Sequence, residues 1–256
     1  MDIEFSDLKQ HLPNLQLHLF ETLDSTSDYL KRHRQQLVFP SLCYTPNQVS
    51  GRGTFHKPWY ASFGDLTFSL ALFIPKPISE LKAFSILVGL TTLKVLKAFK
   101  PEDALFFKWP NDIYLSADKV GGILIEVLQH DGSSTHLSIG IGINLGSVTQ
   151  NCEVLEQHRK ATLGSVNKSK LLEVLVVHLL KLTEREHFLL TQDELQYAAR
   201  YDFFQPNESL QLIQKTEVEW VTYLGLNEQG ACCVKKNGQK MVLQSVQHSL
   251  RKQDKE

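Results

Sequence analysis

Runs of alternating or β-branched apolar residues predict β-strands along the first 145 residues of this 256-residue chain. Successive side chains of a strand point to opposite faces, so a period of two indicates one buried and one open face. The runs that predict strands are residues 17–23, 42–45, 66–73, 113–115, 123–125 and 135–145. A polar turn at residues 116–118 separates two of these runs and predicts a β-hairpin.

Apolar residues at intervals of three and four predict helices elsewhere in the chain. Residues 79–99 carry such a stripe, with lysines on the opposite side. Asn167 can cap a second helix with a leucine stripe over residues 171–182, and the helical signal continues to residue 197. The polar run at 24–27 predicts another helix start.

Beyond residue 203 the pattern changes to short strands. These strands are residues 210–214, 217–224, 231–234 and 240–243. Asn237-Gly238 lies between the last two, and Asn-Gly is a strong hairpin signal. We therefore predict two domains: residues 1–203, an α+β domain with helices on the faces of a mixed β-sheet, and residues 204–256, a small β-barrel whose charged tail is disordered.

Composition excludes several classes of protein. The chain is 42% hydrophobic and 21% charged, as is ordinary for globular proteins, and its net charge of −1 argues against a general nucleic-acid binder. No apolar run approaches the ~18 residues of a membrane span, and the N-terminus does not resemble a signal peptide. The four cysteines lack metal-binding spacing. We expect a cytoplasmic protein with reduced cysteines.

Candidate chemistry concentrates in residues 108–126, which read KWPNDIYLSADKVGGILIE. Lys119 precedes Gly121-Gly122, and glycines in a strand mark a bulge or the close approach of a ligand. The lysine can thus meet an anion that lies over the bared backbone, while Asn111 and Asp112 add an amide and a carboxylate nearby. The alternative is a plain hairpin with a lysine at its edge.

Two earlier stretches offer groups that bind polar ligands. Gly51-Arg52-Gly53 can bring backbone amides and a forked guanidinium to phosphate or carboxylate oxygens, although the spacing is not that of a P-loop. Ser25 and Thr26 add hydroxyls, which can both donate and accept hydrogen bonds. A surface turn and ordinary helix capping are the respective alternatives.

Together these strings resemble the biotin–protein ligases. Residues 108–126 match the family's KWPND-(I/L)-Y-L-x-x-x-K-x-x-GIL-x-E at nearly every fixed position. In the family's G-R-G-R-x-G-R-x-W loop, residues 51–53 and Trp59 match, but Thr54 replaces an arginine, His56 a glycine and Lys57 an arginine. In the family's D-S-T-N string, Ser27 replaces the asparagine.

The resemblance implies a fold and a reaction. The catalytic domain would be like that of the class II aminoacyl-tRNA synthetases and biotin–lipoate ligases, followed by an SH3-like barrel. ATP and biotin would react to give biotinyl-5'-AMP, and a lysine of a biotin carboxyl carrier protein domain would then receive the biotin. Magnesium (Mg2+) is expected with ATP, with unknown protein ligands.

The same resemblance assigns the site. Lys119 would act between the biotin carboxylate and the α-phosphate, and Arg52 would hold the adenylate phosphate from the opposite side. Asp112 would orient Lys119 or a metal-bound water. The biotin site would comprise Ser25, Thr26, Ser27, Gln48, Gly51, Arg52, Gly53, Thr54, Trp59, Lys119, Gly122 and Gly140. The ATP and adenylate site would comprise Arg52, Lys57, Asn111, Asp112, Lys119 and Asn144.

Alternatives to this function come from two classes. A lipoate or octanoate ligase of the same superfamily would need a longer glycine run with a nearby histidine, for which His56 is the candidate. A non-enzymatic biotin sensor or DNA-binding repressor is disfavoured because residues 1–16 are too few for a winged helix and because Lys119 and Arg52 are retained. We expect no DNA or membrane partner, and the oligomeric state, including a homodimer, stays open. In the family a loop at 147–165 covers adenine, but no tryptophan or tyrosine stands there.

Overall fold

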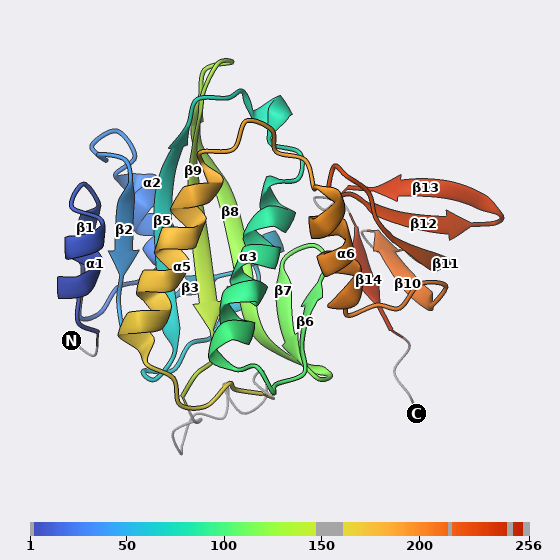
Figure 1. Ribbon diagram of the computed structural model, residues 1–256, viewed down its shortest axis with the longest axis horizontal. Helices are drawn as coiled ribbons and strands as arrows, with labels where there is room; N and C mark the ends of the chain where they lie inside the picture. Colours follow the sequence, from blue (N-terminus) through green and yellow to red (C-terminus); the bar gives the residue numbers. More distant parts are fainter. Residues whose placement is uncertain (1–2, 147–160, 215–216, 245–247, 253–256) are drawn as a thin grey trace.

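The structure is a computed structural model that describes residues 3–146, 161–214, 217–244 and 248–252 (Figure 1). Its centre is a seven-stranded sheet with the strand order β1-β2-β5-β9-β8-β7-β6. Only β1 and β2 pair in parallel; every other pair in this sheet is antiparallel. The strands are β1 Gln16–Leu19, β2 Ser41–Tyr44, β5 Leu66–Ile74, β6 Leu105–Lys108, β7 Asp112–Leu115, β8 Asp118–His130 and β9 Thr135–Ile143.

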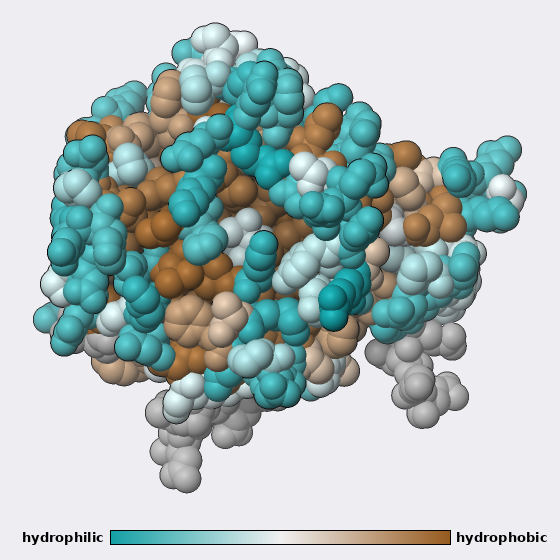
Figure 2. Space-filling model, viewed as in Figure 1, coloured by the Kyte–Doolittle hydropathy of each residue, from teal (hydrophilic) through white to brown (hydrophobic). Residues whose placement is uncertain are grey.

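Helices cover both faces of this sheet. The long helices α3 (Phe84–Phe99) and α5 (Lys168–Leu182) cover one face, and the short helix α2 (Thr26–Arg32) covers the other (Figure 1). The outer sides of α3 and α5 carry many hydrophilic residues, with apolar residues visible between them (Figure 2). The predicted leucine stripe of α5 is buried, from Leu171 to Leu182. The N-terminal helix α1 (Ser6–His11) lies near β1 (Figure 1).

Side-chain caps begin the helices where the sequence indicated. Ser25 caps α2 by accepting a hydrogen bond from the Asp28 amide, and Asn167 caps α5 by accepting one from the Lys170 amide. The helical signal to residue 197 comprises two helices, because α5 ends at Leu182 and α6 runs from Gln192 to Arg200. A capping box of Thr191 and Glu194 starts α6.

The helix predicted at 79–99 begins later than expected. A 3₁₀ turn, η2 (Ile78–Glu80), precedes α3, which starts at Phe84 without a side-chain cap. The Ala83 amide donates to the carbonyl of Phe188 instead of to a helical carbonyl. A contact with a distant segment therefore replaces the first helical turn, and the local pattern could not reveal it.

The C-terminal part is a five-stranded antiparallel sheet with the order β13-β12-β11-β10-β14, consistent with an SH3-like domain (Figure 1). Its strands are β10 Ser209–Gln214, β11 Glu217–Leu226, β12 Cys232–Lys236, β13 Gln239–Leu243 and β14 Ser249–Arg251. Asn237 and Gly238 have φ of 49° and 83°, which confirms the predicted tight turn. The strand β14 was not predicted, and the charged tail at 253–256 lies outside the described residues. The division at residue 203 stays a prediction.

The two sheets are joined by buried hydrogen bonds. The Trp109 indole donates to the carbonyl of Gly230 at 3.2 Å, and the Leu190 amide donates to that of Glu228 at 2.7 Å. The Tyr223 hydroxyl donates to the Asp202 carboxylate, whose pKa burial raises to about 6. Trp109 is only 3% exposed, so the second residue of the KWPND string is part of this junction.

Gly89 lets α3 pack directly on β6, because a Cβ there would lie 2.8 Å from Cζ of the buried Phe107 ring. We expect Gly89→Val to lower the free energy of unfolding by about 1–3 kcal/mol through overpacking. Urea unfolding would measure the change. Ser85→Ala, a partly exposed site on the same helix, is the control and should stay within about 0.5 kcal/mol of wild type. A Gly89→Val protein as stable as wild type would contradict this packing argument.

Candidate active site

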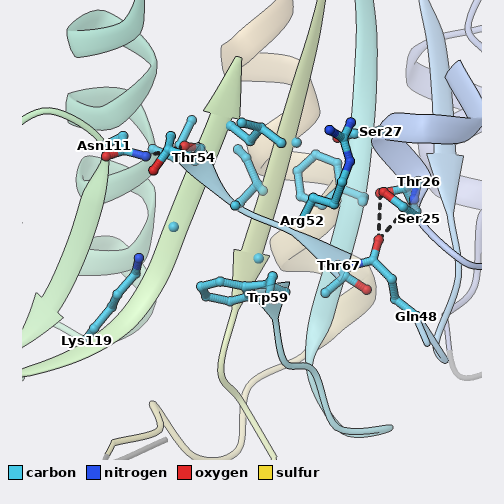
Figure 3. A pocket seen from close by; sticks show the side chains of 18 residues that line it. Ser25, Thr26, Ser27, Gln48, Arg52, Thr54, Trp59, Thr67, Asn111 and Lys119 are labelled. Carbon is cyan, nitrogen blue, oxygen red and sulfur yellow. Dashed lines mark hydrogen bonds between the residues drawn. The ribbon is translucent and has the colours of Figure 1, made fainter. Parts of the chain in front are cut away.

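A cavity lies on the face of the sheet that carries α2. Its walls come from α2, from the central strands β5, β8 and β9, and from a ribbon formed by β3 (Gly51–Arg52) and β4 (Pro58–Trp59). All the residues predicted for biotin line it except Gly51 (Figure 3).

A row of buried hydroxyls forms one end of the cavity. Thr26 Oγ1 lies 2.8 Å from Ser69 Oγ, and Ser27 Oγ lies 3.0 Å from the same atom. Gln48 Oε1 accepts two hydrogen bonds from Thr26, one from its amide at 3.0 Å and one from its hydroxyl at 3.2 Å. The sequence motif supplied Ser25, Thr26 and Ser27, but not Ser69.

When all these contacts form at once, Thr26 donates to Gln48, Ser69 donates to Thr26 and Ser27 donates to Ser69. A hydroxyl has one proton and two acceptor lone pairs. All three protons are used within the chain, so the lone pairs that remain can only accept. This end of the cavity is therefore suited to a ligand that presents N–H donors.

Glycines in β8 and β9 make room for Trp59 and Ser27. A Cβ on Gly142 would lie 2.6 Å from the Trp59 ring, and a Cβ on Gly122 would lie 3.1 Å from it. A Cβ on Gly140 would lie 2.6 Å from Ser27 Oγ. Glycines in a strand can bare its backbone to a ligand, but at Gly142 the indole of Trp59 itself covers the backbone.

Lys119 lies at the other end of the cavity from the hydroxyl row (Figure 3). Its Nζ forms an ion pair with Asp112 Oδ1 at 2.6 Å and lies 5.4 Å from the centre of the Trp59 ring. Lys119 is the second residue of β8, close to a register shift that interrupts the pairing with β7. The side chain is 39% exposed, so its ammonium is held in place yet remains open to a ligand.

Arg52 lines the cavity but points its guanidinium away from Lys119 (Figure 3). Its Nη2 pairs with Asp28 of α2 and, at 3.0 Å, with Glu126 of β8. The phosphate contact predicted for Arg52 on the side opposite Lys119 stays a prediction.

Two of the predicted nucleotide residues bind the backbone of the protein. Asn111 donates to the carbonyl of Ile123 at 2.7 Å while lining the cavity. Asn144 is 6% exposed and donates to the carbonyl of Ala161 at 3.3 Å, outside the cavity lining. Asn144 thus holds the strand β9 to the segment beginning at residue 161. Most of the loop expected over adenine, residues 147–160, lies outside the described residues.

The remaining predicted residues do not line the cavity, except Thr54. Gly51 packs against Gln48, because a Cβ there would lie 2.5 Å from Gln48 Nε2. Lys57 is exposed, and Asp112 forms an ion pair with Lys119. The side chain of His56 lies outside the described structure. Thr54 does line the cavity, at the start of the 3₁₀ turn η1 (Thr54–His56).

The model of the biotin/lipoate A/B protein ligase family matches residues 19–144, which carry every wall of this cavity. Residues 19–144 are thus similar to the biotin/lipoate A/B protein ligase family. The bifunctional ligase/repressor BirA of Escherichia coli is 30% identical over 147 residues, which are 56% of this chain and 46% of that protein. The biotin–[acetyl-CoA-carboxylase] ligase of Paracoccus denitrificans is 31% identical over 99 residues, 38% of this chain and 41% of that protein. The matches thus span less than half the length of both relatives.

Two solved structures share this fold over at least 90% of the chain. The biotin protein ligase from Aquifex aeolicus in complex with biotin and ATP aligns with a TM-score of 0.72 at 24% identity, over 93% of this chain and 99% of that chain. The Helicobacter pylori biotin acetyl coenzyme A carboxylase synthetase with bound biotinylated ATP aligns with a TM-score of 0.63 at 25% identity. This alignment covers 90% of this chain and 100% of that chain. The fold predicted from the sequence is confirmed.

Several residues that line the cavity were not among the predicted site residues. They are Thr67, Phe68, Ile123, Leu124, Ile141 and Gly142. The alternation in 66–73 predicts that Thr67 and Ser69 lie on the same face of their strand. It does not predict which strand pairs with them. The register Thr67↔Gly142 and Ser69↔Gly140 puts both threonine and serine beside the glycine strand.

Lys108, which opens the KWPND string, is the last residue of β6 and is not among the residues that line the cavity. Its Nζ is 3.1 Å from the Tyr114 hydroxyl and lies over the rings of Tyr114 and Phe203. Burial lowers the pKa of Lys108 to about 8, while Asp112 opposes that shift.

No helix among the described residues is long and apolar enough to cross a membrane.

Proposed function

We propose that this protein is an ATP-dependent ligase that activates biotin as biotinyl-5'-AMP and transfers it to a lysine of a biotin carboxyl carrier protein domain. One observation carries the proposal: a single cavity has accepting hydroxyls at one end and the Lys119 ammonium at the other. Biotin has the matching ends, because its ureido ring presents N–H donors and its side chain ends in a carboxylate.

The accepting hydroxyls favour biotin over lipoate or octanoate. The dithiolane ring of lipoate and the alkyl end of octanoate carry no N–H group. Either ligand would leave the buried hydroxyl oxygen of Ser27, which donates to Ser69 in this arrangement, without a donor of its own. An unpaired buried acceptor costs about 1–3 kcal/mol, so the site should reject both.

Lys119 is the group proposed to promote adenylation. A carboxylate oxygen of biotin attacks the α-phosphorus of ATP, the bond from that phosphorus to the bridging oxygen breaks, and pyrophosphate leaves. Two anions must approach each other, and a fixed ammonium between them offsets their repulsion and the developing charge. Asp112 holds Nζ in position for this task.

Transfer completes the proposed reaction. The neutral amine of the carrier lysine attacks the carbonyl carbon of the mixed anhydride, AMP leaves with the bond electrons, and the amine proton is lost to solvent. The carrier and the transfer rest on the names of the relatives, which include a biotin–[acetyl-CoA-carboxylase] ligase.

Magnesium would enter with ATP. The described residues contain no group of three or more His, Cys, Asp or Glu that could hold a metal ion. Mg2+ commonly binds through one or two carboxylates together with substrate phosphates. Asp112 is the carboxylate nearest the proposed reaction centre, and its present partner is Lys119.

Incubation with ATP, Mg2+, radiolabelled biotin and an apo carrier domain tests the proposal. We expect label on the carrier and release of pyrophosphate and AMP, with neither product when ATP is omitted. Parallel reactions with lipoate and octanoate should give background labelling. Biotin binding without pyrophosphate release would indicate a sensor, and preferred lipoate transfer would indicate the other ligase class; either result would refute the proposal.

Thr54 gives a prediction about the lifetime of the intermediate. It lines the cavity where the family has an arginine, whereas Lys57 is exposed and is not among the lining residues described. A guanidinium on phosphate contributes about 1.5–3 kcal/mol. We expect biotinyl-5'-AMP to leave the Thr54→Arg variant about 10- to 150-fold more slowly than wild type.

A chase experiment checks this difference. The pre-formed complex is mixed with excess unlabelled biotin and release is followed over time. Thr54→Val keeps the size of the side chain without adding charge and should match wild type. Equal release from wild type and Thr54→Arg would show that another residue already supplies the charge.

A further inference from the structure

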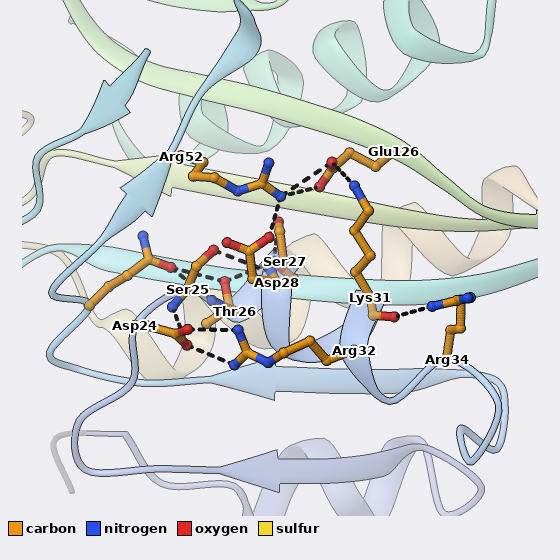
Figure 4. A network of polar contacts seen from close by, with 12 residues as sticks. Asp24, Ser25, Thr26, Ser27, Asp28, Lys31, Arg32, Arg34, Arg52 and Glu126 are labelled. Carbon is orange, nitrogen blue, oxygen red and sulfur yellow. Dashed lines mark hydrogen bonds and ion pairs between the residues drawn. The ribbon is translucent and has the colours of Figure 1, made fainter. Parts of the chain in front are cut away.

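Arg52 is held between the two walls of the cavity by two carboxylates. Asp28 stands in the first turn of α2, directly after the hydroxyl row, and Glu126 stands on β8, two residues after Leu124 of the cavity lining (Figure 4). Arg52 Nη2 contacts Asp28 Oδ1 and lies 3.0 Å and 3.2 Å from the two oxygens of Glu126. One nitrogen thus joins α2 to β8.

The position of Arg52 makes this contact more than a surface ion pair. Exposed pairs typically contribute little, but the side chains here are only 25%, 29% and 18% exposed. Asp28 and Glu126 both reach the same nitrogen, so the two carboxylates lie close together and repel each other unless the guanidinium stays between them. Lys31 lies 3.1 Å from Glu126 and neutralises part of its charge.

The ion pairs of Arg52 attach the β3–β4 ribbon to α2 and β8. At its beginning, the Val49 and Ser50 amides donate to the carbonyls of Leu23 and Asp24. Its own pairing is short, Gly51↔Trp59 and Arg52↔Pro58. Among the described contacts, Arg52 is the residue of the ribbon that forms ion pairs with both α2 and β8.

We propose that Asp28 and Glu126 are positioning residues that hold Arg52 across the cavity and keep the β3–β4 ribbon closed over a bound ligand. Neither carboxylate is among the described lining residues, so both act through Arg52. The proposal rests on the proposed function only in that biotin serves as the ligand. It assigns a role to the last residue of the KWPND…E string.

Stopped-flow measurement of biotin binding and release tests the role. We expect Glu126→Gln and Asp28→Asn each to release biotin about 10-fold faster, because interface changes act chiefly on the dissociation rate. Association should also quicken, since an open ribbon exposes the cavity. Arg32→Gln is the control. Arg32 is half-exposed at the end of α2 and pairs at 2.6 Å with Asp24, which precedes that helix. This variant should leave both rates within twofold of wild type.

A double-mutant cycle separates positioning from a general structural defect. In an Arg52→Met background, Glu126→Gln should add less than a twofold change, because its partner is already gone. The proposal is overturned if both single variants release biotin within twofold of wild type, or if their effects persist undiminished in that background. Should Glu126→Gln fail to fold, Asp28→Asn carries the same comparison.

Hydrogen exchange without ligand keeps this test independent of the proposed function. The Gly53 amide donates to the carbonyl of Lys57 at 2.7 Å and reports on the ribbon. Amides of residues 51–59 should exchange faster in both variants and unchanged in Arg32→Gln. If wild type binds no biotin, the proposed function fails while the exchange still decides whether the carboxylates hold the ribbon. Unchanged exchange in both variants would refute the holding role.

Discussion

Replacement of Lys119 by alanine should lower biotin-dependent pyrophosphate release by about 10²–10³-fold, the usual loss when one fixed electrostatic contact to a transition state is removed. Lys119 lines the cavity, and its Nζ is fixed by Asp112 at 2.6 Å. The loss should appear in kcat, because the two anions meet most closely in the transition state. Pyrophosphate release under saturating biotin and ATP is the measurement.

Two companion variants sharpen the test of Lys119. Lys119→Arg keeps the positive charge and should retain more activity than Lys119→Ala. Lys94→Ala removes an exposed lysine of α3, on the opposite face of the sheet, and should behave as wild type. Matching thermal unfolding curves would show that the folds are intact. Activity of Lys119→Ala within threefold of wild type would exclude the assigned role.

The Gly140→Ala variant should bind biotin about 5- to 150-fold more weakly, the equivalent of about 1–3 kcal/mol of overpacking. The new Cβ would lie 2.6 Å from Ser27 Oγ and 3.4 Å from Ser69 Oγ, so the hydroxyl row must shift. Lysine-dependent chemistry at the far end should be affected much less once biotin is saturating. Titration calorimetry and kinetics at high biotin concentration would separate the two effects.

Ser138→Ala is the matched control for Gly140→Ala. Ser138 lies two residues earlier on the same face of β9, is 1% exposed, and its hydroxyl has no hydrogen-bond partner among the described residues. Its removal should leave biotin affinity within about twofold of wild type, since no contact is lost. An unchanged affinity in Gly140→Ala would mean that the hydroxyl row is not the ligand site.

Local patterns predicted most elements of the fold because their causes are local. Ser25 and Asn167 cap helices through atoms three residues away, and the turn at Asn237-Gly238 needs only its own two residues. Where distant segments decide, the predictions failed. The start of α3 depends on Phe188, and β14 exists only by pairing with β10.

The site shows the same division between local and long-range causes. The strings at 24–27, 48–59 and 108–126 supplied most lining residues because each string carries its own chemistry. Ser69 was missed because a serine in a strand is an ordinary residue until pairing with Gly140 places it beside Ser27. The carboxylate partners of Arg52 could not be foreseen either, since Glu126 lies 74 positions away.

The buried junction at Trp109 has a consequence for any attempt to study the two sheets separately. Gly230, which accepts the Trp109 proton, has φ of 71° and is so close to α3 that a Cβ there would lie 2.6 Å from Ile86 Cγ1. Removal of residues 204–256 would strip Trp109 of its acceptor and uncover the start of α3 around Ile86 to water. Loss of activity in such a shortened protein would report damage to the domain that carries the cavity, so it could not serve as a measure of what the C-terminal sheet contributes to catalysis.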